Sequence, residues 1–427
     1  KLVKKNSEGQ KTPIRSCLLL AVLLTPFGLL PLVKGSIAIL CLAIATLSFI
    51  LFAAMKNWRG VALVGFIPPI SLVVFWLLSG QPIISGYTEA MAIGGIKSEI
   101  IYYIVVSLIL LWVIFKEERS DATIRIVALL MFAVAFFLSF KGGFVRHDGH
   151  AIISGTVIVL TGLLVASAYG SSRSLSALFV AFFVWLYIDS LYIKTSPQGF
   201  LDNVEKTYKK SWYGLNLRFK DKEELVRDYN ETIARIHAKS DFPKLQGTTD
   251  IYSYDQSYLL ASGNIWNPRP IFQSYSVYTP ALAEKNREHL IGSNAPDNLI
   301  FKVQTIDGRL HQMDDGASWP VILSSYAPDR MMDDYLLLRK KKINQDLSPT
   351  VVSKEKYAFG NVVAIPDGKK PVFLKVYIKP SFIGKIANTL FKPSQLWITI
   401  NLENGSSRNY RMISGMIETG VLLSPLV

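Results

Sequence analysis

The chain has 427 residues, of which 50% are hydrophobic and 18% are charged, and its mean hydropathy is +0.30. An ordinary soluble domain carries about 25% charged residues. This composition excludes a wholly cytosolic protein, a disordered chain and a disulfide-rich scaffold. Hydrophobic blocks of roughly 16–20 residues, long enough to cross a bilayer, occur only before about residue 193.

The net charge of +14 is spread evenly along the chain. Residues 1–193 hold 15 Lys and Arg against 8 Asp and Glu, and the remainder holds 31 against 24, so each part carries +7. A concentrated basic tract of the kind found in nucleic-acid binders is absent from the sequence, so we expect no nucleic-acid partner. Membrane lipids account for the excess of cations. Cys17 and Cys41 both lie in hydrophobic blocks, so the region after residue 193 has no thiol for a disulfide or a zinc site.

The hydrophobic blocks predict an α-helical polytopic membrane domain over residues 1–193. We expect about seven spans, with Pro26 and Pro31 distorting the first. The spans lie at about residues 16–33, 36–55, 60–79, 99–115, 124–140, 151–170 and 175–193.

The charges of the short loops predict the orientation of these spans. With a cytoplasmic N-terminus, the inner segments hold eleven Lys and Arg and the outer loops hold four. This bias follows the positive-inside rule. Seven spans then place loops 81–98 and 141–150, together with residues 194–427, on the same extracytoplasmic side.

Residues after the last span predict three further regions. Residues 194–246 are expected to form an amphipathic helical stalk, because residues 199–240 have helical periodicity. In residues 247–354, strands at 250–254, 299–305 and 335–339 alternate with helices at 279–290 and 319–326, which predicts an α/β domain. Residues 355–427 are expected to form a β-sandwich module, with strands at 357–365, 372–378, 396–402 and 409–413 and a hairpin turn at Asn404-Gly405.

The loop at residues 141–150 concentrates ionisable residues between two spans. It contains Lys141, Arg146, His147, Asp148 and His150, and ionisable groups at membrane depth are candidates for function. Arg146 and Lys141 can clamp a phosphate or pyrophosphate. Asp148 or a histidine can act as general base, and the two histidines with Asp148 can ligate a divalent ion. The competing interpretation is a polar interfacial turn with snorkelling cations.

Three other carboxylates lie near the outer side. Glu89, in the loop at 81–98, is a candidate general base or a partner of Arg146, and it is equally well explained as an exposed loop residue. Glu99 lies at the edge of the following span. Asp189, near the end of the last span, is a weaker candidate that snorkelling or pairing explains equally well.

An aromatic stretch at residues 266–279 is the candidate sugar-binding region. Trp266 and Tyr275 offer ring faces, and Arg269 and Gln273 offer hydrogen-bond donors, the combination that a sugar ring requires. The same residues can also form a buried core. Asp314-Asp315-Gly316 is interpreted as a turn in preference to a metal-binding carboxylate pair. No Gly-rich phosphate loop, serine nucleophile elbow or zinc-protease helix occurs in the sequence.

The layout resembles that of bacterial polytopic enzymes that assemble envelope glycans. These are the C-type glycosyltransferases that use polyprenyl-phosphate sugars, and the O-antigen ligases and polymerases. The resemblance lies in the multi-span body, the polar outer loops and the C-terminal segment at 405–426, which looks like the β-sandwich modules of such proteins. C-type enzymes carry an acidic residue in the first outer loop. Here that loop is Lys34-Gly35, so either an N-terminal portion precedes the sequence or Glu89 and Asp148 take the role.

The sequence and the resemblance together predict an integral-membrane glycosyltransferase of the bacterial inner membrane. It would transfer a sugar or glycan from a polyprenyl-(pyro)phosphate donor to a glycan acceptor in envelope polysaccharide assembly, with a divalent cation as the one candidate cofactor. The alternative is a non-catalytic glycan-binding or export subunit of a membrane complex. A transporter is disfavoured because the polar residues lie at the rim rather than the midplane, where transporter sites are found. Pro68-Pro69 within the third span is the one feature that favours it.

Overall fold

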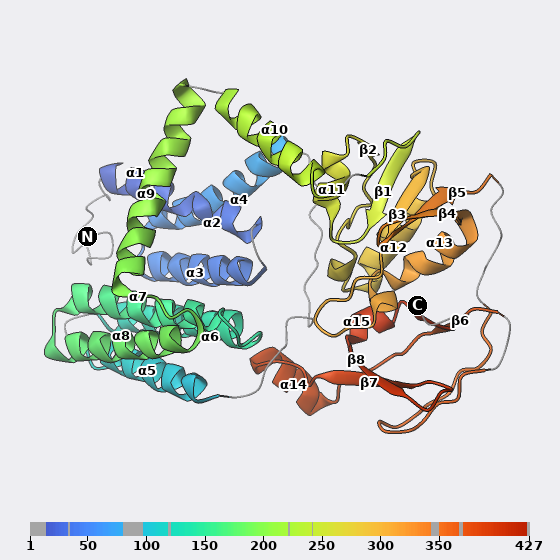
Figure 1. The fold of residues 1–427 in the computed structure, drawn as a ribbon. Coiled ribbons are helices and arrows are strands. Elements are labelled where there is room, and N and C mark those ends of the chain that lie inside the picture. The colour runs from blue at the N-terminus through green and yellow to red at the C-terminus, as the bar shows by residue number, and fades with distance from the viewer. Residues whose placement is uncertain are drawn as a thin grey trace. The chain divides into compact units, whose positions relative to one another are not determined.

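Figure 1 shows the computed structural model, in which the described residues are 14–32, 35–79, 97–117, 121–220, 223–240, 242–342, 350–366 and 370–424. The chain divides into two compact units. The first comprises the described residues up to 202 together with 390–392, and the second comprises residues 203–389 and those from 393 onward. Each unit has its own hydrophobic cores.

The first unit contains six helices that are long and apolar enough to cross a membrane. The protein is therefore a multi-pass membrane protein. The helices are α3 (Gly35–Ala54), α4 (Trp58–Ser79), α5 (Ser98–Phe115), α6 (Ala122–Phe144), α7 (Ala151–Tyr169) and α8 (Ser172–Tyr192).

The predicted first span is not one long helix. It is divided into α1 (Ile14–Leu24), α2 (Pro26–Leu29) and the short 3₁₀ turn η1 (Leu30–Leu32). The break falls at Thr25 because Pro26 lacks an N–H and its ring opposes continuation of a preceding helix. The predicted count of seven spans is thus not confirmed, whereas the distortion expected at Pro26 is.

Small residues allow close packing of the last three helices in this unit. A Cβ at Gly143 of α6 would lie 2.1 Å from the Ser154 hydroxyl of α7, and one at Gly162 would lie 3.1 Å from Leu178 of α8. Such contacts are typical of membrane helices, whose association depends on packing and interhelical hydrogen bonds. One such bond joins the Tyr103 hydroxyl to the Phe136 carbonyl at 2.8 Å.

The second unit begins within the amphipathic helix α9 (Pro197–Lys220), which is followed by α10 (Glu223–His237). Helices are therefore present where residues 199–240 predicted them, and the second ends at His237. A five-stranded sheet with the order β2-β1-β3-β5-β4 comes next. Its strands are β1 (Thr248–Tyr252), β2 (Ile265–Trp266), β3 (Asn298–Phe301), β4 (Tyr326–Met332) and β5 (Tyr335–Lys340).

The first three strands are parallel and are joined by helices on opposite faces of the sheet. Leu259 of α11 (Gln256–Ala261) packs in one core, and Leu290 of α12 (Pro280–Ile291) packs in the other. Strands β4 and β5 complete the sheet as an antiparallel hairpin. The predicted alternation of strands and helices is confirmed. Strand β4 was not predicted, and the helix predicted at 319–326 is α13 (Trp319–Ser325), which ends one residue earlier.

The C-terminal region contains two small sheets that share one core. Strand β6 (Val372–Leu374) pairs with β9 (Val421–Ser424), and β7 (Leu396–Asn401) pairs with β8 (Ser407–Met412). The β7–β8 hairpin confirms the turn at Asn404-Gly405, where Gly405 has φ +78°. The strand predicted at 357–365 is wrong, since these residues form no regular structure, and helix α14 (Phe382–Leu390) was not foreseen. Small sheets are thus present, but the sandwich arrangement is not confirmed.

Candidate functional site

Four helix ends meet at one end of the α5–α8 bundle. Helices α5 and α7 begin there, and α6 and α8 end there, because consecutive helices of the bundle are antiparallel. The loop predicted at residues 141–150 is shorter in the structure, because α6 continues to Phe144. The remaining polar turn, at residues 145–150, lies beside Glu99 at the start of α5 and Tyr192 at the end of α8.

His147 and its partner Glu99 form the buried part of this polar turn. His147 is 4% exposed and Glu99 is 1% exposed, and His147 Nε2 donates to Glu99 Oε1 at 3.0 Å. Tyr192 donates its hydroxyl to the same carboxylate oxygen and accepts a hydrogen bond from Lys97 Nζ at 3.2 Å. The imidazole also contacts the ring of Phe144 edge to face, with centroids 5.4 Å apart. These contacts fix the side chain of His147 inside the protein.

The backbone of the turn is held by the same contacts. His147 has φ +53°, a left-handed conformation that costs a non-glycine residue roughly 1–2 kcal/mol. The hydrogen bond to Glu99 and the packing on Phe144 offset this cost. Helix α7 then begins directly after the turn, with the Ala151 N–H donating to the Asp148 carbonyl at 2.9 Å.

Arg146, Asp148 and His150 form the partly exposed part of the turn and are joined by two charged contacts. Arg146 Nε donates to Asp148 Oδ2 at 2.6 Å, and His150 Nδ1 lies 2.5 Å from Asp148 Oδ1. The Asp148 carboxylate also accepts the His150 backbone N–H at 3.0 Å. The exposed side-chain fractions of Arg146, Asp148 and His150 are 33%, 44% and 48%.

The hydrogen bonds of this exposed pair keep the Asp148 carboxylate ionised. Partial burial favours the neutral acid, but hydrogen bonds from His150 and Arg146 outweigh it and lower the pKa of Asp148 to about 2. An ionised carboxylate only accepts hydrogen bonds, so Nδ1 of His150 must carry the proton. In neutral His150 the lone pair is then on Nε2. This arrangement, with a carboxylate orienting an imidazole, is that of a general base.

The other membrane-side candidates fall at different places. Lys141 Nζ donates to the carbonyl of Phe391 at 2.6 Å, and residues 390–392 belong to the same unit. Asp189 is 5% exposed and accepts hydrogen bonds from the Thr195 N–H and hydroxyl, so it closes the end of α8. Glu89 lies outside the described residues.

The three residues considered as metal ligands do not converge. His147 is directed toward Glu99, whereas His150 and Asp148 pair with each other. Within the described part of the chain, no group of three or more His, Cys, Asp or Glu side chains is placed to hold a metal ion.

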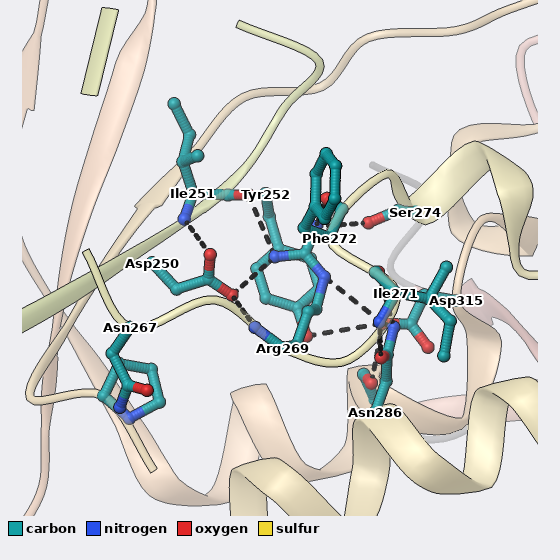
Figure 2. A network of polar contacts seen from close by, with 12 residues as sticks. Asp250, Ile251, Tyr252, Asn267, Arg269, Ile271, Phe272, Ser274, Asn286 and Asp315 are labelled. Atoms are coloured by element: carbon teal, nitrogen blue, oxygen red, sulfur yellow. Dashed lines mark hydrogen bonds and ion pairs between the residues drawn. The ribbon is translucent and has the colours of Figure 1, made fainter. Parts of the chain in front are cut away.

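The aromatic stretch of the second unit contains a buried ion-pair network, which Figure 2 shows. Arg269 is 1% exposed, and its Nη1 donates to Asp250 Oδ2 at 2.7 Å and to the Ile251 carbonyl at 2.9 Å. Its Nη2 donates to the Phe272 carbonyl and the Ser274 hydroxyl, each at 2.8 Å. The guanidinium is therefore directed into the domain and not toward the surface.

A second buried carboxylate closes this network. Asp315 lies 3.9 Å from Arg269 Nε and accepts hydrogen bonds from Asn286 at 3.0 Å and Ser318 at 2.9 Å. The guanidinium stacks on the ring of Tyr252, 3.6 Å from its centroid. Burial raises the pKa of Asp315 to about 7, although Arg269 and the hydrogen bonds oppose the rise. Asp315 has φ +59°, in agreement with the turn predicted at 314–316.

The remaining residues of the aromatic stretch lie around this network. Trp266 is half-buried and donates its indole N–H to Asp250 Oδ1 at 3.1 Å. Gln273 and Tyr275 are half-buried, and the Tyr275 carbonyl accepts from Arg309 at 3.0 Å. Arg269 and Trp266 thus contribute to the inside of the domain, as the competing core interpretation expected.

Sequence reasoning missed the partners that hold these groups. Glu99 was noted only for its position, and Tyr192, Asp250 and Asn286 were not considered. The signal available for Glu99 was a carboxylate at the start of a hydrophobic span, which is costly without a partner. No family model matches the chain, and no curated protein or solved structure is significantly similar to it.

Proposed function

We propose that the protein is an integral-membrane glycosyltransferase that acts at the extracytoplasmic face of a bacterial inner membrane. It transfers a sugar or glycan from a polyprenyl-(pyro)phosphate donor to a glycan acceptor during envelope polysaccharide assembly. The observation that carries this proposal is the partly exposed Asp148–His150 pair beside Arg146, at the end of a bundle of membrane helices. A donor whose lipid tail lies in the bilayer presents its phosphate at this level.

The exposed residues supply the two functions that such a transfer needs. The acceptor hydroxyl oxygen attacks the anomeric carbon, the bond from that carbon to the phosphate oxygen breaks, and the phosphate leaves with the electron pair. His150 Nε2 takes the proton of the hydroxyl, while Asp148 orients the ring and stabilises the imidazolium. Arg146 stabilises the charge on the leaving phosphate.

The membrane orientation is part of the proposal. The proposal takes the segment of α1, α2 and η1 as a further crossing, which puts the five cations of the N-terminal segment on the same side as Lys116, Arg125 and Arg173. The positive-inside rule therefore favours the polar turn on the outer side. The acceptor-binding surface is proposed to come from the second unit, which follows α8 in the chain.

The experiment uses the full-length chain in lipid nanodiscs. A panel of undecaprenyl-phosphate-linked hexoses is offered as donors with oligosaccharide acceptors, and released undecaprenyl phosphate is measured. We expect His150→Ala to lower turnover by about 10²–10⁴-fold, the usual contribution of a general base, while the affinity for undecaprenyl phosphate is unchanged. Arg146→Ala is expected to abolish both binding and turnover.

Arg125, at the opposite end of α6 from the polar turn, provides a matched control. Arg125 lies near the start of α6 and donates to the Glu117 carbonyl at 2.9 Å. Arg125→Ala removes an equal charge from the same membrane unit and should leave turnover unchanged. Full turnover in Arg146→Ala would refute the assignment. Binding of undecaprenyl phosphate without turnover of any donor would favour the non-catalytic subunit.

A further inference from the structure

Helix α9 (Pro197–Lys220) presents an unusual apolar stripe. At 100° per residue, the side chains of one arc of about 120° are almost all large and apolar. They lie at positions 200, 201, 204, 208, 212, 215 and 219. All seven are exposed, from 42% at Val204 to 80% at Phe219, with Trp212 at 66%. A stripe of this size on a helix requires something to cover it.

The polar arc of the same helix is basic. It carries Lys206, Lys209, Lys210 and Lys220, with Arg218 at the edge of the stripe, against the two acidic residues Asp202 and Glu205. Aromatic and aliphatic residues on one face with lysines on the other are the composition of helices that lie in a membrane interface. The lysines then face the anionic headgroups.

The position of α9 in the chain places it close to a bilayer. Only four residues separate it from Tyr192, the last residue of membrane helix α8. Its first turn still belongs to the membrane unit, where the Phe200 ring meets the Trp185 ring of α8 edge to face, with centroids 6.4 Å apart. At 1.5 Å per residue the helix is about 36 Å long, so its stripe would cover a substantial strip of surface.

We propose that α9 lies along an anionic lipid surface, with its apolar stripe inserted between headgroups and acyl chains. The occupant of the stripe is thus the bilayer itself and not another protein. This inference does not depend on the proposed enzymatic activity. It replaces the expectation of a stalk that rises away from the membrane, and it keeps the connection to the second unit at the level of the polar turn.

Helix α10 (Glu223–His237) is a natural comparison within the same chain. It also exposes apolar side chains, with Leu225 at 48% and Tyr229 at 59%. Its charged residues, however, are four acidic against two Arg, so its charge is opposite to that of α9. An anionic surface should therefore attract α9 and repel α10.

The test places single spin labels on the full-length protein in bilayers. Cys17 and Cys41 are replaced by Ala, and one cysteine is introduced per variant in α9. The stripe is sampled by Trp212→Cys and Leu215→Cys, and the opposite arc by Lys206→Cys. Collision of each nitroxide with oxygen, which concentrates in acyl chains, is compared with collision with a water-soluble nickel chelate.

In bilayers of phosphatidylglycerol and phosphatidylethanolamine we expect the oxygen-to-nickel ratio to be several-fold higher at 212 and 215 than at 206. Tyr229→Cys in α10 should give the water-exposed value. Low collision with both reagents at 212 and 215 would show that protein covers the stripe, and high nickel collision would show that water does; either overturns the proposal. Equal ratios in phosphatidylcholine bilayers would overturn the requirement for anionic lipid.

Discussion

The polar turn of the membrane unit and the ion-pair network of the second unit are built from the same residue types but differ in exposure. Each combines arginine, aspartate and an aromatic or imidazole ring. In the turn, Asp148 and His150 are nearly half exposed. In the network, Arg269 and Asp250 have no exposed side-chain surface.

This difference in exposure separates residues that can contact a substrate from residues that only stabilise the fold. A fully buried ion pair cannot reach a substrate, and its removal leaves a charge without compensation. A partly exposed pair contributes little to stability, because water screens it, yet it is accessible to a ligand. The two regions should therefore respond in opposite ways to similar substitutions.

The largest effect on stability is expected from Arg269→Ala. It leaves Asp250 and Asp315 buried without their cation, which costs about 3–5 kcal/mol of unfolding free energy. Calorimetry of the full-length protein in nanodiscs would record this as a lower transition temperature of the second unit.

The control for this prediction is an exposed pair in the same unit. Arg287 and Glu284 of α12 pair at 2.5 Å with exposed side-chain fractions of 38% and 46%. Arg287→Ala should cost at most about 0.5 kcal/mol. Equal losses of unfolding free energy in the two variants would contradict the distinction between buried and exposed ion pairs.

A smaller effect is expected from Glu99→Ala, which tests the division within the polar turn. The substitution leaves the buried His147 and the half-buried Tyr192 without their shared acceptor, at a cost of about 1–3 kcal/mol. Chemical unfolding in detergent micelles measures the loss. Asp148→Ala, in the exposed part of the turn, should lower the free energy of unfolding by less than about 1 kcal/mol. A larger loss would mean that the whole turn serves to stabilise the fold.

The membrane helices were predictable from sequence because a long hydrophobic run is a local property. The break before Pro26 was visible for the same reason. Strand β4 was not, since residues 326–332 contain Pro328 and pair with β5 only through the tertiary fold. The residue types of the turn at 145–150 indicated a site, and the structure places Arg146, Asp148 and His150 together.

The pairings within both regions depended on contacts between distant residues. His147 and Glu99 are 48 positions apart, and their contact depends on how α5 packs against α6 and α7. Arg269 lies among aromatic residues that suggested a sugar site. Its burial is set by Asp250, 19 positions earlier, on a strand of the sheet. Sequence alone could not show that Arg269 would be buried and Arg146 partly exposed.

The last prediction concerns the pH dependence of the stability of the second unit. Burial raises the pKa of Asp315 to about 7 in the folded state, whereas an aspartate of an unfolded chain has a pKa near 3.9. Between these values the folded state holds a proton that the unfolded state releases. The contribution of Asp315 to stability is therefore fully present below about pH 4 and is lost as the pH rises through 7, with a slope of at most about 1.4 kcal/mol per pH unit.

Asp315→Asn isolates this contribution, because asparagine has nearly the same shape, tolerates the left-handed backbone at φ +59° and does not ionise. The free energy of unfolding should then vary less between pH 4.5 and 7 than in the unaltered protein. Asp333, exposed and with φ +50°, provides the same exchange in the same backbone conformation at the surface, so Asp333→Asn should leave the slope unchanged. An unchanged slope in Asp315→Asn would mean that Asp315 is ionised inside the network, with Arg269 compensating two carboxylates at once.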